Sequence, residues 1–262
     1  MAFLEFTYKS KALKMNITVN VLLPEKGNNS PDAGAPEGTF KTLYLLHGVG
    51  ANHADWVRKT NIERYAANHS IAVVMPAVER SWYADTAYGM KYLTFITTEL
   101  PNVCRSYFKG MSPRREDNLI AGFSMGGYGA IKAALTCPDA FCACASLSGA
   151  LDITRDGRTY DLEQWRGIFG YDLPDATYLK GTEHDIFALA EKNQAAGLPF
   201  PKLYMWCGTE DTLITANRKY HDLLNNMKIP HSYNESAGTH TWKYWDEFIQ
   251  PALEYMLSDN NE

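Results

Sequence analysis

The sequence contains no apolar run long enough to cross a bilayer. Its longest apolar stretches, such as Ile71 to Val78, fall far short of the roughly 20 residues that a transmembrane helix needs. The first residues, Met1 to Phe6, include neither a basic segment nor the sustained apolar segment of a secretory signal. We therefore expect a soluble cytoplasmic protein that does not act at a membrane.

An excess of positive charge is also absent. The chain has 25 basic and 30 acidic side chains, a formal net charge of -5 and a pI near 5.8. Because nucleic acids and anionic lipids are held by clustered Lys and Arg, neither partner has electrostatic support here. The composition favours a small-molecule ligand.

Cysteines are few and odd in number, with five in 262 residues. Cys142 and Cys144 form a C-x-C pair without the second pair that a structural zinc site requires. On a strand both thiols would point to the same face. We expect reduced thiols, no metal and no disulfide framework.

Apolar residues are plentiful, at 45% of the chain, and no internal repeat is evident. The size allows one large core, so we expect a single domain over residues 1–262. Two early segments, Phe3 to Tyr8 and Met15 to Pro24, have strand character, and the second alternates polar and apolar residues. Five later apolar runs lack alternation, as in strands covered on both faces. These runs are Thr42 to Leu46, Ile71 to Met75, Asn118 to Ala121, Phe141 to Leu147 and Leu203 to Cys207.

Helical patterns separate the later runs, which predicts an α/β fold with a mostly parallel central sheet and helices on both faces. The final helix has apolar residues at helical spacing from Trp242 to Met256. Met90 to Phe108 also reads as helical, although Pro101 must kink the helix or start a second one. Asp152 to Glu183 is the least regular region, and we interpret it as a small cap-like insertion.

The most informative segment is Gly122-Phe123-Ser124-Met125-Gly126, which joins an apolar strand to a helix rich in small residues. This is the strand, tight turn and helix of a nucleophile elbow, in which glycines leave room for a serine on a strained backbone. The alternative is a glycine-rich connection without chemistry.

A serine hydroxyl needs a base, and the base needs a carboxylate that fixes its tautomer. His240, in the loop before the final helix, is the preferred base, and His231 is the other candidate after the serine. Asp211 is the preferred acid, because it follows the strand that ends at Cys207. Its neighbour Glu210 is the alternative, in which case Asp211 would only cap the next helix.

An oxyanion hole would complete the site with two backbone N–H groups. Met125, the residue after the serine, should supply one of them. Val49 should supply the other, with Gly48 as the alternative, since His47-Gly48-Val49-Gly50 ends the first central strand in a glycine-rich turn. A plain turn at the end of a strand is the simpler interpretation.

Together these segments resemble the tributyrin esterase branch of the esterase D group of α/β-hydrolases. The matching segments are Tyr44 to Gly48, Asn52 to Trp56, Ser81 to Thr86, Gly122 to Gly129, Cys207 to Asp211 and His240 to Trp245. The resemblance implies a serine carboxylesterase acting on short acyl esters, no cofactor and a homo-oligomer. It places the triad on Ser124, Asp211 and His240, and the oxyanion donors on Val49 and Met125.

The related S-formylglutathione hydrolases have a cysteine where this chain has Gly50-Ala51-Asn52, which weakens a thioesterase interpretation. Trp82, Tyr83 and Trp242 could line the substrate pocket, since aromatic walls suit apolar ligands, or could pack in the core. Three other functions stay open: an acetyl or hydroxycinnamoyl esterase acting on carbohydrate esters, an acyltransferase, and a non-catalytic binding protein.

Overall fold

The computed structural model describes residues 1–26, 34–154, 162–170 and 176–258, and its centre is an eight-stranded sheet. The order across the sheet is β1-β2-β4-β3-β5-β6-β7-β8. The strands are β1 (Ala2–Lys9), β2 (Asn16–Leu23), β3 (Thr42–Leu46), β4 (Ala72–Pro76), β5 (Asn118–Phe123), β6 (Ala143–Leu147), β7 (Lys202–Gly208) and β8 (His231–Ser236).

The first part of the sheet is antiparallel and the rest is parallel. β1 pairs antiparallel with β2, and β2 pairs antiparallel with β4. From β4 through β3 to β8 every pairing is parallel. β1 alternates between half-buried and exposed residues, whereas every residue of β3, β4, β5 and β6 is buried. The prediction of a mostly parallel, doubly covered sheet is confirmed.

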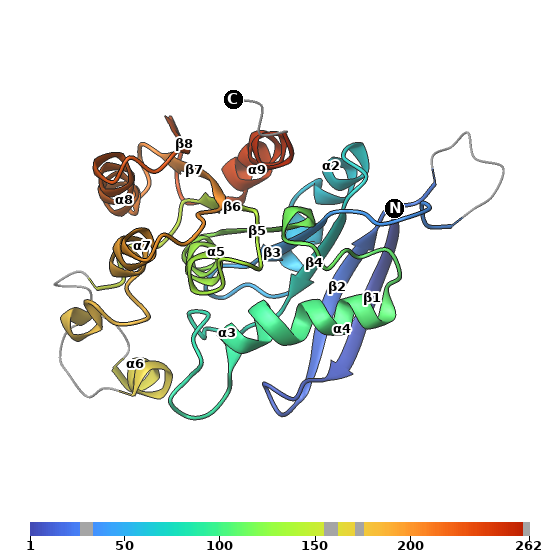
Figure 1. Ribbon diagram of the computed structural model, residues 1–262, viewed down its shortest axis with the longest axis horizontal. Coiled ribbons are helices and arrows are strands. Elements are labelled where there is room, and N and C mark those ends of the chain that lie inside the picture. The colour runs from blue at the N-terminus through green and yellow to red at the C-terminus, as the bar shows by residue number, and fades with distance from the viewer. Residues whose placement is uncertain (27–33, 155–161, 171–175, 259–262) are drawn as a thin grey trace.

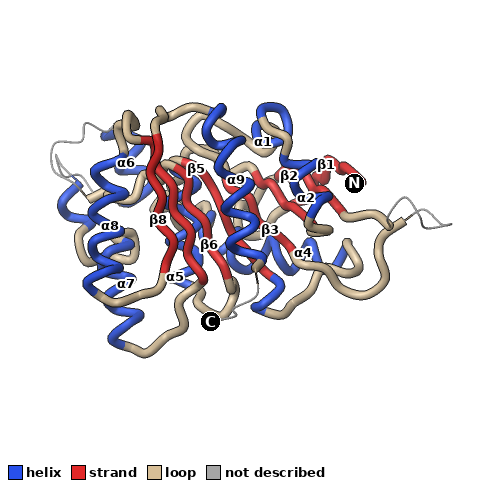
Figure 2. Tube along the Cα trace, turned by 90° about the horizontal axis from the view of Figure 1, so that it is seen from above, coloured by secondary structure: helices blue, strands red, loops and turns tan. Residues whose placement is uncertain are grey.

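Helices cover both faces of the sheet (Figures 1 and 2). On one face α1, α2 and α9 pack around Trp56, Ile62 and Ile249, and on the other α4, α5, α7 and α8 contribute Leu100, Tyr128, Ala190 and Tyr220 to a second core. The helices are α1 (Asp55–Lys59), α2 (Ile62–Asn68), α3 (Tyr92–Thr94), α4 (Leu100–Tyr107), α5 (Met125–Thr136), α6 (Leu162–Phe169), α7 (Ile186–Ala195), α8 (Ile214–Asn226) and α9 (Trp242–Leu257).

The predicted helix from Met90 to Phe108 is one nearly continuous helix with a widened turn. A π-helical stretch, Phe95–Glu99, joins α3 to α4 just before Pro101. Proline has no N–H to donate to the preceding turn, and a π turn is a common way to absorb such a defect. The chain therefore accommodates Pro101 within the helix.

The predicted insertion, Asp152 to Glu183, lies partly outside the described residues. Its described parts contain α6 and a 3-10 turn, Ala176–Leu179. Backbone hydrogen bonds from Ala87 and Tyr88 to the carbonyl oxygens of Ile168 and Gly167 hold the end of α6 against the loop after β4. This part of the region is thus attached to the main fold.

Parallel strands end at a common edge of the sheet, and ligands bind at that edge in folds of this kind. The loops after β3, β5, β7 and β8 begin at His47, Ser124, Thr209 and Ala237, respectively. These four loops contain the residues that the sequence predicts for the triad and the oxyanion hole.

Candidate active site

Ser124 occupies a strained turn between β5 and α5. Its φ is 54° and its ψ is -120°, a conformation that residues with a side chain rarely adopt. The turn can close because Gly122 has no Cβ. A Cβ at this position would lie 2.5 Å from the carbonyl carbon and oxygen of Gly126. A Cβ at Gly126 would in turn lie 2.6 Å from the carbonyl oxygen of Leu46. Both glycines of the motif are therefore sterically required.

The structure brings Ser124, His240 and Asp211 into one hydrogen-bonded chain. His240 Nε2 is 2.9 Å from Ser124 Oγ, and His240 Nδ1 is 2.8 Å from Asp211 Oδ2. With the proton on Nδ1, the imidazole donates to the carboxylate and accepts the serine proton on its other nitrogen. The Asp211 side chain is fully buried, whereas that of His240 is 33% exposed. A substrate can therefore reach the imidazole but not the carboxylate.

Hydrogen bonds hold Asp211 in its ionised form. Burial by itself would raise the pKa of this carboxyl, but the hydrogen bonds from His240 and from the Leu213 N–H outweigh it and keep the pKa below its ordinary value. The Leu213 N–H donates to Oδ1 over 2.8 Å, so Asp211 binds the start of α8 and His240 at the same time. The two roles weighed for Asp211 coexist.

Glu210 points elsewhere. It is exposed, and its Oε2 accepts a hydrogen bond of 2.6 Å from the Gly238 N–H. Of the two neighbouring carboxylates, Asp211 is the one that lies against His240.

Two backbone N–H groups beside Ser124 are free of protein acceptors. In the described part of the chain, the N–H groups of Val49 and Met125 donate to no backbone or side-chain acceptor. Met125 begins α5, where the first N–H groups have no partner within the helix. Val49 is 44% exposed in the loop after β3. These are the two positions predicted for oxyanion donors.

A buried histidine supports the loop that contains Val49. Burial lowers the pKa of His47 to about 4, so its ring is neutral. Its Nδ1–H donates to the Gly48 carbonyl oxygen over 2.8 Å, and its Nε2 accepts from the Val78 N–H over 2.9 Å. This support from His47 was not predicted from the sequence.

A cavity of about 350 Å³ contains the reactive pair. Ser124 and His240 lie in its wall together with Trp242 and Lys59. Phe123 and Trp245 also line it, and their rings stack with centroids 4.1 Å apart. Three aromatic side chains and one ammonium group are therefore among the residues that line the cavity.

The three predicted pocket aromatics divide between this cavity and the core. Trp242 lines the cavity, whereas Trp82 and Tyr83 are not among its lining residues. Tyr83 is fully buried, and its hydroxyl donates to the His47 carbonyl oxygen over 2.8 Å. Trp82 is 8% exposed and packs edge-on against Trp165 of α6. For these two residues the packing role is the one that the structure displays.

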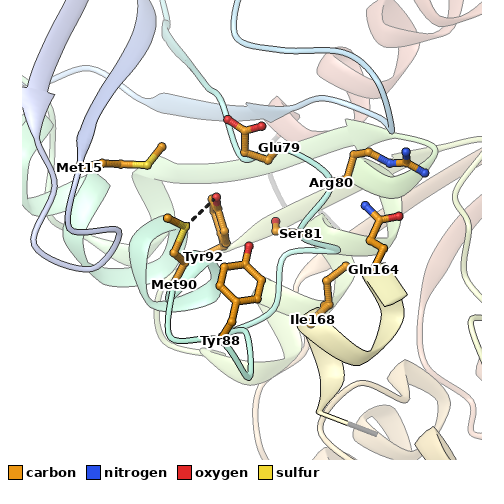
Figure 3. Close-up of a pocket in the computed structure, with 10 residues that line it drawn as sticks. Met15, Glu79, Arg80, Ser81, Tyr88, Met90, Tyr92, Gln164 and Ile168 are labelled. Carbon is orange, nitrogen blue, oxygen red and sulfur yellow. Dashed lines mark hydrogen bonds between the residues drawn. The ribbon is translucent and has the colours of Figure 1, made fainter. Parts of the chain in front are cut away.

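A larger hollow of about 470 Å³ lies between the β1–β2 hairpin, the loop after β4 and α6 (Figure 3). Met15 lies on one side of it and Gln164 on the other, and Tyr88 lies between them. The Tyr92 hydroxyl donates to the Met90 sulfur over 3.4 Å. None of the residues of the hydrogen-bonded chain lines this hollow, so its greater volume does not make it the reaction site.

Over the described ranges, no three His, Cys, Asp or Glu side chains are grouped so that they could hold a metal ion. A separate search of the same ranges finds no helix with the length and hydropathy of a membrane span.

The sheet order, the covering helices and the elbow define an α/β-hydrolase fold. A comparison with solved structures supports this class: FphF, a fluorophosphonate-binding serine hydrolase of Staphylococcus aureus, superposes with a TM-score of 0.87 at 35% identity, covering 98% of this chain and 99% of that one. An S-formylglutathione hydrolase (FrmB) of Staphylococcus aureus superposes with a TM-score of 0.84 at 36% identity and the same coverage.

The chain belongs to the esterase family whose model is described as "Putative esterase", which matches residues 10–256. A curated relative, the acetyl esterase of Caldicellulosiruptor saccharolyticus, is 34% identical over 266 residues and covers 98% of both chains.

Proposed function

We propose that this esterase is a serine carboxylesterase that hydrolyses short-chain acyl esters through an acyl-enzyme intermediate. The observation that carries the proposal is the hydrogen-bonded chain from Ser124 Oγ through His240 to Asp211, with distances of 2.9 and 2.8 Å. A buried carboxylate, a partly exposed imidazole and a serine on a strained turn are the parts that nucleophilic acyl transfer needs.

In the first half of the reaction, Ser124 attacks the ester carbonyl while His240 Nε2 takes the hydroxyl proton. Asp211 stabilises the imidazolium that forms and keeps its proton on Nδ1. The N–H groups of Val49 and Met125 bind the oxyanion. His240 then donates its proton to the departing alcohol, which leaves the acyl group on Ser124.

In the second half, His240 takes a proton from water, and the resulting hydroxide attacks the acyl carbonyl. Collapse of the second tetrahedral intermediate returns the proton from His240 to Ser124 and releases the acid. The bond between Ser124 Oγ and the acyl carbon forms in the first half and breaks in the second, and Ser124 regains its proton. The net change is the addition of water across the ester bond, so the proposed cycle uses no cofactor.

The preference for short acyl groups is supported by the cavity. Its volume of about 350 Å³ is at the small end of ligand pockets, and aromatic side chains are among the residues that line it. The resemblance to tributyrin esterases points the same way. A series of p-nitrophenyl esters from acetyl to octanoyl should give the highest kcat/KM at butyryl or shorter, and a maximum at octanoyl would contradict this preference.

Replacement of the nucleophile is the direct test of the activity. Ser124→Ala should lower kcat on p-nitrophenyl butyrate by about 10⁶, because the attacking oxygen is lost. A fluorophosphonate should label the unmodified protein at Ser124 and leave the variant unlabelled. A variant that retains most of its activity would refute the assignment, and an unlabelled unmodified protein would indicate a non-catalytic binding protein.

Acetylated carbohydrate is the second candidate substrate, because a relative that covers 98% of this chain is named an acetyl esterase. Initial rates on tributyrin, acetylated xylooligosaccharide and methyl ferulate would separate the two. A rate on the acetylated sugar far above that on tributyrin would favour the carbohydrate esterase, and a rate on methyl ferulate above both would favour a hydroxycinnamoyl esterase.

A further inference from the structure

Two loops of the site are joined by a reciprocal pair of hydrogen bonds. The Glu210 side chain accepts from the Gly238 N–H over 2.6 Å, and the Glu210 N–H donates to the Gly238 carbonyl oxygen over 3.0 Å. One residue earlier, the Thr209 N–H donates to the Ser236 carbonyl oxygen over 2.9 Å. The loop that contains Asp211 is therefore bonded along its length to the loop that contains His240.

The loop of His240 lies at one edge of the sheet. It links the last residue of β8, Ser236, to the first residue of α9, Trp242, and β8 is the edge strand beside β7. Gly238 lies within this link, two residues before His240. A contact that fixes Gly238 therefore limits the positions that His240 can reach.

Close packing at Gly238 makes the contact specific. A Cβ on Gly208 would lie 2.2 Å from the Gly238 carbonyl oxygen, so only glycine lets the two loops approach this closely. The Tyr244 ring packs on another side of Gly238, where an added Cβ would lie 3.1 Å from Cδ1 of that ring. The peptide at Gly238 is thus held by backbone on one side and by a ring on another.

The carboxylate form of Glu210 suits this contact. The hydrogen bond from the Gly238 N–H, followed by one from the Thr209 side chain, holds the pKa of Glu210 below its ordinary value. Glu210 and Asp211 are consecutive, yet one binds the backbone of the His240 loop and the other binds the imidazole itself. The same loop is held at two points by two adjacent carboxylates.

We propose that Glu210 is a positioning residue that fixes the His240 loop for proton transfer through the hydrogen bond that its side chain accepts from Gly238. The inference rests on the proposed role of His240 as the base. The side chain acts as an acceptor of the correct length, and its charge is secondary because it is exposed to solvent.

Three variants distinguish the effect of the length of the Glu210 side chain from the effect of its charge. Glu210→Ala removes the acceptor, Glu210→Asp keeps the charge but is one methylene too short, and Glu210→Gln keeps an oxygen at the same reach without the charge. We expect kcat on p-nitrophenyl butyrate to fall about 10- to 100-fold in the alanine and aspartate variants, the range in which small displacements of reacting groups act. Glu210→Gln should retain at least about half of kcat, since its amide oxygen still accepts from Gly238.

Two further readouts distinguish positioning from loss of stability. KM should change less than about twofold in all three variants, because the side chain of Glu210 does not line the cavity. The rate of fluorophosphonate labelling of Ser124 should fall in parallel with kcat, since labelling needs the same base. Glu235→Ala is the matched control. It removes a carboxylate of the same edge strand whose hydrogen-bond partners, among the described residues, are Arg218 and the Tyr233 hydroxyl, both outside the His240 loop, so its kcat should stay within twofold.

An active unmodified protein whose Glu210→Ala and Glu210→Asp variants keep full kcat would overturn this inference and leave the proposed function intact. A Glu210→Gln variant as impaired as Glu210→Ala would also overturn it, since charge would then be the working property. An unmodified protein that neither hydrolyses the ester nor reacts with the fluorophosphonate would overturn the proposed function, and this inference with it.

Discussion

At the scale of single residues, two adjacent carboxylates have different partners. Asp211 lies 2.8 Å from His240 Nδ1, whereas Glu210 reaches the backbone at Gly238. Residue type alone could not separate them, because either carboxylate can orient a histidine. What separates them is the path of the turn after β7, which directs only the second side chain inward.

Replacing the inward carboxylate tests its proposed role. Asp211→Asn should lower kcat by about 10⁴, because an amide no longer stabilises the imidazolium and can favour the wrong tautomer. Steady-state kinetics on p-nitrophenyl butyrate will measure this loss. A larger loss in Glu210→Gln than in Asp211→Asn would move the role of the acid to Glu210.

The close approach of the two loops gives a second prediction at this scale. Gly208→Ala should lower kcat at least 10-fold, because its Cβ would lie 2.2 Å from the Gly238 carbonyl oxygen and must push the His240 loop away. Gly167→Ala in α6 is the control, since its Cβ would meet nothing nearer than 3.5 Å. Equal activity of the two variants would show that the loops can separate without cost to the reaction.

Sequence reasoning located the candidate site residues because their types and chain order are distinctive. The glycines flanking Ser124 have a steric cause, which the structure displays in contacts with Leu46 and with each other. The support from His47 and Glu210 was not predicted, because it consists of bonds to backbone atoms. Such bonds depend on how loops approach in space and leave no pattern in the sequence.

At the scale of helices and strands, apolar runs predicted the central strands well. Thr42 to Leu46 was predicted with its observed bounds, and β7 extends one residue beyond the predicted Leu203 to Cys207 at each end. β6 begins at Ala143, two residues after the predicted Phe141, whose ring instead packs edge-on against Tyr44. Phe141 is buried although it lies before the first residue of β6, so hydrophobicity alone overestimates the length of this strand.

The packing of α5 gives a prediction about an element. Gly129 faces Tyr83, and its Cβ would lie 2.2 Å from that ring, which is fully buried and bonded to the His47 carbonyl oxygen. Gly129→Ala should therefore lower the free energy of unfolding by about 1–3 kcal/mol, although alanine favours helices. Urea denaturation will measure this loss of unfolding free energy. A variant as stable as the unmodified protein would show that the Tyr83 ring can move to make room for the added Cβ.

At the scale of the whole molecule, a buried ammonium group couples stability to pH. Lys132 of α5 is fully buried, with Nζ 2.9 Å from His184 Nδ1 and 5.6 Å from the centroid of the Tyr128 ring. Burial lowers its pKa from 10.5 to about 7, and the charges of Glu183 and Asp85 only partly oppose this. Below pH 7 the folded protein therefore bears the full cost of a buried charge.

Between pH 7 and 10.5 the unfolded chain binds the lysine proton and the folded protein does not, so this group makes stability rise with pH across that window. We compare the unfolding free energy of the unmodified protein with that of Lys132→Met. The difference, unmodified protein minus variant, should rise by on the order of a few kcal/mol between pH 7 and 10.5. Urea denaturation at both ends of the window will measure this difference. Lys192→Met, at an exposed position of α7, should show none, and a flat difference for Lys132→Met would contradict the prediction.

Oligomeric state is also a property of this scale. The resemblance to esterases of the esterase D group leads us to expect a homo-oligomer built from single-domain chains of 262 residues. Light scattering on the purified protein will test this, and a mass near 29.5 kDa at micromolar concentration would contradict it.

The ring of Trp245 lies edge-on to the ring of His240, with centroids 4.9 Å apart. Both rings line the cavity that contains Ser124. A fluorophosphonate bound to Ser124 should therefore change the intrinsic fluorescence of the protein, which would make its attachment visible without any ester substrate. Replacing Trp245 with phenylalanine should weaken that optical signal and leave the other indoles as background.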